Sequence, residues 1–299
     1  MDTLSATSAS LCPTMKAFFL VSIALLCPFF LVAQTPSATA WKSTVTKAPA
    51  GAFPLLTPCR IEYDLSWNNL LSAGTAMIRF QNAADAWIAR AEAGTNGLAR
   101  GLWKYDCTMA SVLDAATLRS RYMEHSETDS AETISYRVAF SPAEVRTAAK
   151  VNPKGAATTL KNTVCPYGPV DDIQAAILYV RSQPLTAGQV ITRVIQPFDR
   201  PYLATFTVLA RETRTVAGTD YPTIRLDVKI RKLHATKLEL SSYKKMKTAT
   251  IWVSDDAWRV PVEMHASIWV GFVSATLTKR EYLTGKDALG KLPPSMVVK

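Results

Sequence analysis

Two aspartate doublets, Asp171-Asp172 and Asp255-Asp256, are the residues whose type and spacing best suit acid–base or metal chemistry. Neighbouring carboxylates can separate their pKa values or bind a hard cation such as calcium. A hydrolase built on these doublets requires the two pairs to lie within about 10 Å of each other in a cleft. The alternative is structural, because aspartate favours helix caps and turns, and each doublet lies where one of these is expected.

The motifs of common enzyme classes are absent from the sequence. The three histidines, His125, His234 and His265, do not have the spacing of an HExxH metal site. The chain contains no GxSxG nucleophile elbow, no P-loop, no GxGxxG nucleotide-binding turn and no CxxC redox motif. The sequence therefore predicts no catalytic residue, no metal site and no cofactor, and it favours a non-enzymatic protein.

A basic stretch, residues 229–247, is the clearest candidate for contact with an anionic partner. The whole chain has a formal net charge of +10, and this stretch contains seven cations against one acid, Glu239. It can meet lipid head groups or an anionic glycan, at about 1 kcal/mol per cation near a charged membrane. It can equally be the solvated face of a hairpin. The cations are Lys229, Arg231, Lys232, Lys237, Lys244, Lys245 and Lys247.

Most elements that position these residues are predicted to be strands. Residues 60–67, 134–140 and 224–231 alternate apolar and polar side chains, the period of a strand with one buried and one wet face. One wet face per strand favours an antiparallel sheet. The predicted fold is mainly β (α+β). It is a large curved antiparallel sheet, or an open or half barrel, with one or two short helices over residues 171–182 and 97–105.

The helix predicted over residues 171–182 can be capped by Asp171 or Asp172. Its apolar stripe consists of Ile173, Ala176, Ile177 and Val180. The chain has seven tryptophans, and most aromatic residues are expected to pack in the core. Curved sheets also enclose apolar ligand cavities, and in that arrangement this helix would act as a lid.

The amino terminus has the composition of an export signal. Lys16 precedes an uncharged apolar run, residues 17–33, and small or polar residues follow it. We expect Met15 to be the translation start, residues 1–33 to form a signal peptide cleaved after Ala33, and the chain to be periplasmic. Export disfavours nucleic acid as a partner, and no other stretch is long and apolar enough to span a bilayer. The alternatives are a retained membrane anchor and a lipid-modified Cys27.

After cleavage, the expected organisation has three parts. Residues 34–52 are rich in Ser, Thr, Ala and Pro and are predicted to be a flexible leader. Residues 53–280 are expected to form a single β-rich domain, and residues 281–299 a loose tail. The expected mature chain keeps three cysteines, which form at most one internal disulfide in an oxidising periplasm or are small buried hydrophobic residues. They are Cys59, Cys107 and Cys165.

Four separated segments carry motifs in a recognisable order. The first is FPLLTPCRIEYDLSWNNLLSAGTAMI, and the second is DDIQAAILYVRSQPLTAGQ, a helix followed by R-x-x-P-L-x-x-G. The third is RETRTVAGTDYPTIRLDVK, and the fourth is ATIWVSDDAWRVPVEMHASIWVGFVSATL, with the pattern W-x-S-x-D-x-x-R-x-P and a later glycine. The motif residues are Tyr63, Gly74, Asp172, Tyr179, Arg181, Gly188, Trp252, Asp256, Arg259, Pro261 and Gly271, with Asp255 beside Asp256.

In order and spacing, these segments resemble the bacterial family catalogued as domain of unknown function 3108. The resemblance implies an exported protein of a Gram-negative envelope with a largely antiparallel β fold, and it implies no catalytic residue. The layout is also similar to half-barrel lipoprotein carriers, in which a curved sheet and a few helices enclose an acyl chain. That second likeness concerns architecture only. The family opening usually has an apolar residue at the position of Cys59.

The motif residues also have structural interpretations. Arg259 is expected to pair with the nearby aspartate doublet across a short turn, and Pro261 to fit a sheet edge. Gly188 and Gly271 fit positions of unusual backbone shape or close approach. Arg181, near the end of the predicted helix, can offset exposed carbonyl groups.

Three functions follow as hypotheses. The first is a non-enzymatic envelope protein that binds an apolar or amphiphilic, lipid-like ligand in a curved β sheet. The second is an envelope interaction or scaffold domain that binds a protein or glycan through its surface. The third is a hydrolase built on the aspartate doublets. A bound lipid distinguishes the first two, and the separation of the doublets tests the third.

Overall fold

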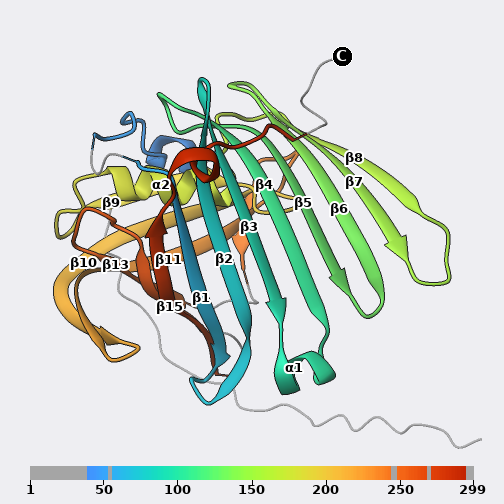
Figure 1. Ribbon diagram of the computed structural model, residues 1–299. Coiled ribbons are helices and arrows are strands. Elements are labelled where there is room, and N and C mark those ends of the chain that lie inside the picture. The colour runs from blue at the N-terminus through green and yellow to red at the C-terminus, as the bar shows by residue number, and fades with distance from the viewer. Residues whose placement is uncertain (1–38, 53–55, 244–247, 268–270, 294–299) are drawn as a thin grey trace, which may run out of the picture. The chain divides into compact units, whose positions relative to one another are not determined.

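The computed structural model describes residues 39–52, 56–243, 248–267 and 271–293. The expected signal peptide and Lys244, Lys245 and Lys247 of the basic stretch lie outside these residues. Strands dominate the described chain (Figure 1). In chain order the elements are η1 (Ala40–Thr44), β1 (Cys59–Trp67), β2 (Leu71–Ala83), β3 (Ala86–Thr95), α1 (Gly97–Leu102), β4 (Tyr105–Asp114), β5 (Ser120–Asp129), β6 (Glu132–Phe140), β7 (Val145–Pro153), β8 (Thr159–Cys165), α2 (Ile173–Ser182), β9 (Val190–Ile195), β10 (Tyr202–Val216), β11 (Thr219–Leu233), β12 (Leu240–Ser242), β13 (Thr248–Ser254), β14 (Pro261–Ser267), β15 (Phe272–Tyr282) and η2 (Gly285–Ala288).

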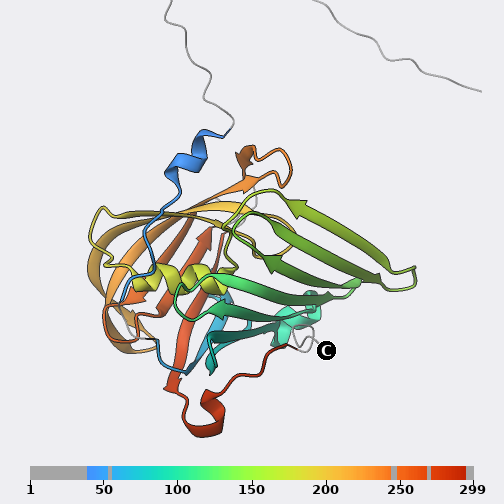
Figure 2. The same cartoon turned by 90° about the horizontal axis from the view of Figure 1, so that it is seen from above.

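The strands form one large antiparallel sheet. Their order is β8-β7-β6-β5-β4-β3-β2-β1-β15-β14-β13-β11-β10-β9, and the short β12 pairs with β11 off this path. β8 and β9 are the two ends of the path, so the sheet is open and does not close into a barrel. Figure 2 shows the sheet bending around α2, with β10, β11 and β13 on one side and β3 to β8 on the other. The predicted fold, a large curved antiparallel sheet with two short helices, is confirmed.

Strand β1 illustrates how the sequence produces this sheet. Ile61 and Tyr63 are each 2% exposed and face the core, while Arg60 and Glu62 lie on the wetter face and form an ion pair at 2.7 Å. This alternation follows from the two-residue period of a strand. The predicted inward row ends at Trp67, which is 41% exposed because it is the last residue of the strand.

Helix α2 lies between two parts of the core. Its Ala175 and Leu178 pack in a cluster with residues of β1 to β4 and of β13 to β15, and its Tyr179 and Val180 pack in a second cluster with β9, β10 and β11. A third cluster joins residues of β5 to β8 with residues of β9, β10 and β11. The two ends of the open sheet are therefore connected through side chains. In addition, Gln196 donates a buried hydrogen bond of 2.6 Å to Thr147.

Both chain segments that flank the sheet are packed against it where the structure describes them. Residues 39–52, expected to be a flexible leader, include the buried Trp41, whose Nε1 donates to the carbonyl oxygen of Leu238 at 2.9 Å. The expected loose tail contains η2, and its Gly290 N–H donates to the carbonyl oxygen of Asn82 at 2.8 Å. Composition alone did not reveal these contacts, because each depends on one side chain or one backbone group meeting a distant strand.

Candidate functional site

An apolar cavity of about 360 Å³ lies between α2 and the concave face of the sheet. Its volume falls within the range of small-molecule sites, roughly 300 to 1,000 Å³. Among the residues that line it, only His265 and Ser274 are of polar types. The apolar lining residues are Leu65, Ile173, Ala176, Ile177, Ile195, Ala204, Phe206, Val228, Ile230, Ala249, Ile251, Pro261, Met264, Ala266, Val273 and Ala275.

Helix α2 forms one wall of this cavity with three residues of its predicted apolar stripe: Ile173, Ala176 and Ile177. Ile173 is 37% exposed, whereas Leu178 and Tyr179 on other sides of the helix are each 1% exposed. The helix is apolar on nearly all sides because the core encloses it. Within the stripe that the sequence identified, Ala176 and Val180 are buried, and Ile173 and Ile177 are the residues of α2 that are not.

The amino-terminal end of α2 is held by the first aspartate doublet. The Asp172 carboxylate accepts hydrogen bonds from the N–H groups of Gln174 at 2.8 Å and Ala175 at 2.9 Å, which confirms the predicted cap. Asp171 forms a fully buried ion pair with Arg193, and Arg119 lies 3.2 Å from the same carboxylate. Both carboxylates are thus engaged in holding the helix and the strand beside it.

The carboxyl-terminal end of α2 is held by two motif arginines. Arg181, itself buried, donates from Nη2 to the carbonyl oxygen of Trp258 at 2.6 Å. Arg259 donates from Nη1 to the carbonyl oxygen of Gln183, just after the helix. Arg181 therefore connects α2 to the turn between β13 and β14. The expectation was that it would offset the carbonyl groups of its own helix.

The second aspartate doublet lies in the turn between β13 and β14. Asp255 pairs with Arg211 at 2.8 Å, and Asp256 pairs with Arg280 at 2.6 Å. The Arg259 guanidinium, which was expected to pair with this doublet, donates to the carbonyl oxygen of Gln183 at the end of α2, and the Arg259 backbone N–H donates to the Asp256 carboxylate at 3.2 Å. Burial opposes ionisation of Asp256, but hydrogen bonds from Ser254 and Arg280 outweigh it and lower the pKa of this carboxyl.

The two doublets lie at opposite ends of α2. Asp172 is its N-cap, and the turn that contains Asp256 contacts its last residues through Arg181 and Arg259. Ten helical residues span about 15 Å. This separation exceeds the about 10 Å that the hydrolase hypothesis required. The structure does not bring the four carboxylates into one cleft.

Two further motif residues, Tyr63 and Pro261, contact each other, and Pro261 also lines the cavity. The Tyr63 hydroxyl donates to the carbonyl oxygen of Pro261 at 3.0 Å, and burial raises the pKa of the tyrosine. Pro261 begins β14, which lies between β13 and β15. We expected Pro261 at a sheet edge, and this was wrong. Proline has no N–H to donate to a neighbouring strand, and the first residue of an interior strand tolerates this as well as an edge strand does.

The motif glycines occupy positions that require glycine. Gly188 has a φ of +80° and Gly271 a φ of +71°, both in the left-handed region. Gly74 lies where an added Cβ would overlap the carbonyl oxygen of Gly94 on the neighbouring strand. The predicted roles in unusual backbone shape and close approach are therefore confirmed for Gly188 and Gly271.

The motif tryptophan, Trp252, is buried but does not line the cavity. Trp252 Nε1 donates to the Glu212 carboxylate at 2.6 Å, and the Arg214 guanidinium lies 4.4 Å from the centre of a Trp252 ring. Tyr179 is also occupied elsewhere, because its hydroxyl donates to the carbonyl oxygen of Ala48 and its ring stacks on Arg193. Neither residue lines the cavity.

The described part of the basic stretch is separate from the cavity. Lys229 lies 3.9 Å from Asp227, and Lys232 lies over the Tyr243 ring at 5.7 Å. Arg231 and Lys237 are exposed. These cations lie on β11 and on the turn after it, which agrees with the hairpin interpretation.

The three cysteines of the described residues are free thiols. Cys59 and Cys165 are buried, and Cys107 is half-buried. Burial raises the pKa of Cys59 to about 11. Of the two alternatives for these residues, the arrangement fits small hydrophobic residues.

Sequence reasoning missed most of the residues that line the cavity. They are mostly apolar residues of β10 to β15, such as Phe206, Ile251 and Ala275. Their only signal is strand alternation, which marks a filled core and a cavity wall equally.

One solved structure among the comparisons supports this fold. The chain is similar to a β-barrel-like protein of domain of unknown function 1849 from Brucella abortus, with a TM-score of 0.52 and 8% identity over 77% of this chain and 99% of that chain. A protein with a YmcC-like fold from Bacteroides fragilis, provisionally described as exported, has a TM-score of 0.30, with 11% identity over 78% and 99% of the two chains. A provisionally described lipoprotein from Parabacteroides distasonis has a TM-score of 0.31, with 7% identity over 79% and 100%. None of the curated proteins compared with the chain matches it.

Neither helix among the described residues has the length and hydropathy that crossing a bilayer requires. The segments quoted above as motifs lie almost entirely within the span that matches a family model. That model, described as a protein of unknown function (DUF3108), matches residues 62–278. The chain therefore belongs to the DUF3108 family of proteins of unknown function.

Proposed function

We propose that this protein is a non-enzymatic component of the cell envelope that binds an apolar or amphiphilic, lipid-like ligand in the cavity beneath α2. The observation that carries the proposal is the cavity itself, about 360 Å³ in volume and lined almost entirely by apolar side chains. The export signal expected over residues 1–33 supports an envelope location.

The chemistry of the lining indicates which part of a ligand the cavity suits. Each methylene group moved from water into such an environment contributes about 0.8 kcal/mol. A head group placed there would lose its hydration, because few polar atoms of the lining can replace water. The ligand class supported best is therefore an aliphatic chain whose polar end stays outside the cavity.

Native mass spectrometry tests this proposal on mature protein, residues 34–299, purified from periplasm without detergent. A stoichiometric adduct of lipid mass, identified after organic extraction, is the expected result. Binding of fatty acids should strengthen about tenfold for every two methylene groups until the cavity is full. A clean unliganded mass that envelope lipids leave unchanged would refute the proposal and favour a surface interaction domain.

Two cavity variants give the test its specificity. Ala275→Phe and Ala249→Phe each place a ring in the space between α2 and the sheet, and both should lose the adduct. Ala148→Phe is the matched control, because Ala148 is exposed on β7 and does not line the cavity. Adduct retained in both cavity variants would place the ligand elsewhere.

A further inference from the structure

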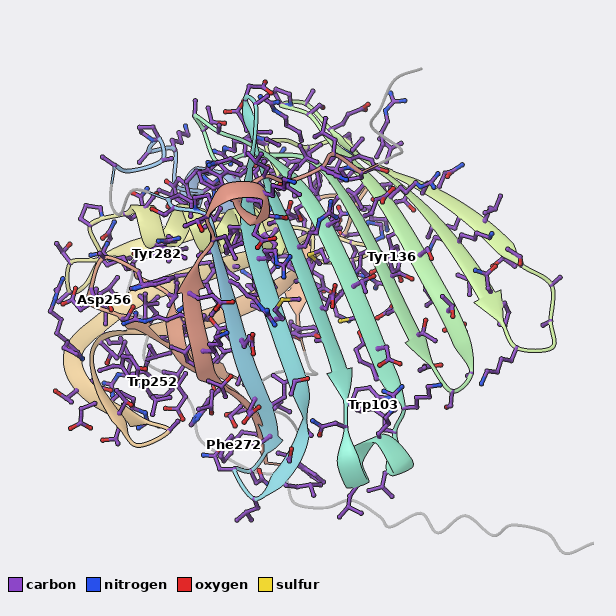
Figure 3. All side chains as sticks on the ribbon, viewed as in Figure 1. Trp103, Tyr136, Trp252, Asp256, Phe272 and Tyr282 are labelled. Atoms are coloured by element: carbon purple, nitrogen blue, oxygen red, sulfur yellow. The ribbon has the colours of Figure 1, made fainter. Side chains whose placement is uncertain are left out.

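One end of the sheet carries large apolar side chains that are turned into solvent. We call them the apolar rim, and it consists of Trp67 and Leu70 at the turn between β1 and β2, and Leu98, Leu102 and Trp103 in or just after α1. Their exposures are 41%, 91%, 77%, 84% and 58% respectively. Figure 1 places this turn and α1 at the same end of the sheet, and Figure 3 shows Trp103 there.

The turn that presents Leu70 is well ordered. Asn68 and Asn69 have φ values of +53° and +54°, as in a two-residue hairpin turn with both central residues left-handed. The Asn68 side-chain oxygen accepts from the N–H of Phe272 at 2.8 Å, and Asn69 accepts from the Ser274 hydroxyl at 2.6 Å. The polar side chains of the turn are thus used to fix it, while its leucine points outward.

The helix α1 has the same organisation. The Arg100 guanidinium makes two hydrogen bonds to the Asp106 carboxylate, at 2.8 Å and 2.9 Å, which ties α1 to β4. Leu98 and Leu102 are four residues apart and therefore share one side of the helix. Trp103 stacks on Tyr105 with ring centres 5.1 Å apart, and it remains more than half exposed.

The two parts of the rim are neighbours, and the cavity reaches them. The N–H of Asn96, just before α1, donates to the carbonyl oxygen of Ala73 at the start of β2. Trp67 pairs with Val273 across β1 and β15, and Val273 lines the cavity. Leu65, two residues before Trp67 on the same face of β1, also lines it. The rim therefore borders the cavity.

The composition of the rim identifies the kind of surface that it fits. Residues 67–73 carry no charge, and in residues 96–104 the Arg100 charge is paired with Asp106 while Lys104 is exposed. Projecting leucines and tryptophans with a nearby cation are typical of side chains that enter the head-group region of a bilayer. Such separate projections on a turn and a short helix suit a fluid lipid surface better than a rigid protein surface.

We propose that the apolar rim inserts into the surface of a lipid bilayer that contains anionic lipid, so that the cavity opens towards the membrane. The inference rests on the proposed function for its purpose, since it gives an aliphatic ligand a route between bilayer and cavity that avoids water. The insertion itself depends only on the rim.

Flotation with vesicles of phosphatidylethanolamine and phosphatidylglycerol tests the inference on the full mature chain. Wild-type protein should float with the vesicles. Burial of one leucine contributes about a tenfold change in partitioning, so Leu70→Glu/Leu102→Glu should bind at least about a hundredfold more weakly. Leu160→Glu is the matched control, because Leu160 is 78% exposed on the edge strand β8, and this variant should float like wild type.

The outcomes separate the rim from the cavity. Rim insertion is supported if the rim variant keeps its lipid adduct in native mass spectrometry but does not float with vesicles. It is also supported if the Ala275→Phe variant floats although it has no adduct. Floating wild-type protein with no adduct in any preparation would refute the proposed function and leave the rim inference standing. Wild-type protein that does not float overturns the inference. The inference is also overturned if light scattering shows that wild-type protein is a dimer and the rim variant is a monomer. That result would mean that the rim binds a second copy of the chain.

Discussion

Replacing Asp172 with alanine tests whether the cap at the start of α2 holds the helix over the cavity. The carboxylate accepts from the N–H groups of Gln174 and Ala175 at 2.8 Å and 2.9 Å, and its side chain is 0% exposed. Loss of a cap costs about 1 kcal/mol. Each N–H left buried without an acceptor adds about 1 to 3 kcal/mol. We therefore expect Asp172→Ala to lower the free energy of unfolding by at least about 3 kcal/mol, measured by urea titration with circular dichroism.

Two control variants isolate the cap. Asp172→Asn keeps a side-chain oxygen that can accept both hydrogen bonds, so it should cost less than about 1 kcal/mol. Asp129 accepts from two N–H groups in the same way, at 2.7 Å and 2.9 Å, but in an open turn between β5 and β6. Water can replace that acceptor, so Asp129→Ala should also cost less than about 1 kcal/mol. The reasoning is wrong if Asp172→Ala and Asp129→Ala destabilise the protein equally.

Three further predictions concern buried or paired titratable groups. Arg193→Met removes a fully buried partner of Asp171 and should cost about 3 to 5 kcal/mol in urea unfolding, part of which Asp171→Asn should restore; an unchanged midpoint would contradict this. Hydrogen bonds from Arg121 lower the pKa of Asp114 to about 2, below its value in the unfolded chain, so the stability it contributes is complete above about pH 4 and is lost as pH falls through 2. Asp114→Asn should remove that dependence, and an NMR titration midpoint near 4 would disprove the shift. Burial raises the pKa of Cys59 to about 11, so iodoacetamide at pH 8 should label this thiol only after unfolding.

The sheet and the cap of α2 were predictable because their signals are local. Alternation in residues 60–67 fixes which side chains of β1 face inward, and Asp172 stands directly before the helix it caps. The contacts at the other end of α2 were not predictable. Arg181 meets a carbonyl oxygen 77 residues away, and Arg259 meets one 76 residues away. Every residue has a backbone carbonyl oxygen, so the residue that accepts such a hydrogen bond can be of any type. The contact therefore leaves no recognisable pattern in the sequence.

The cavity escaped prediction for a different reason. Ala204, Ala249 and Ala275 occupy inward positions that a packed core would also give to alanine. Whether such side chains fill the space depends on the curvature of the sheet and on the summed volume of all facing residues. Neither quantity can be obtained from the pattern of a single strand.

The division of roles around α2 separates the family motif from the choice of ligand. Asp172, Arg181 and Arg259 hold the two ends of the helix, and none of these side chains lines the cavity. The lining consists mainly of apolar residues, whose sizes set the free volume and which take no part in those contacts. Ala275→Phe should therefore remove the lipid adduct while the hydrogen bonds at both helix ends stay intact. If the proposed function holds, these motif contacts keep α2 over the cavity, and the sizes of the lining residues set how much ligand it can take.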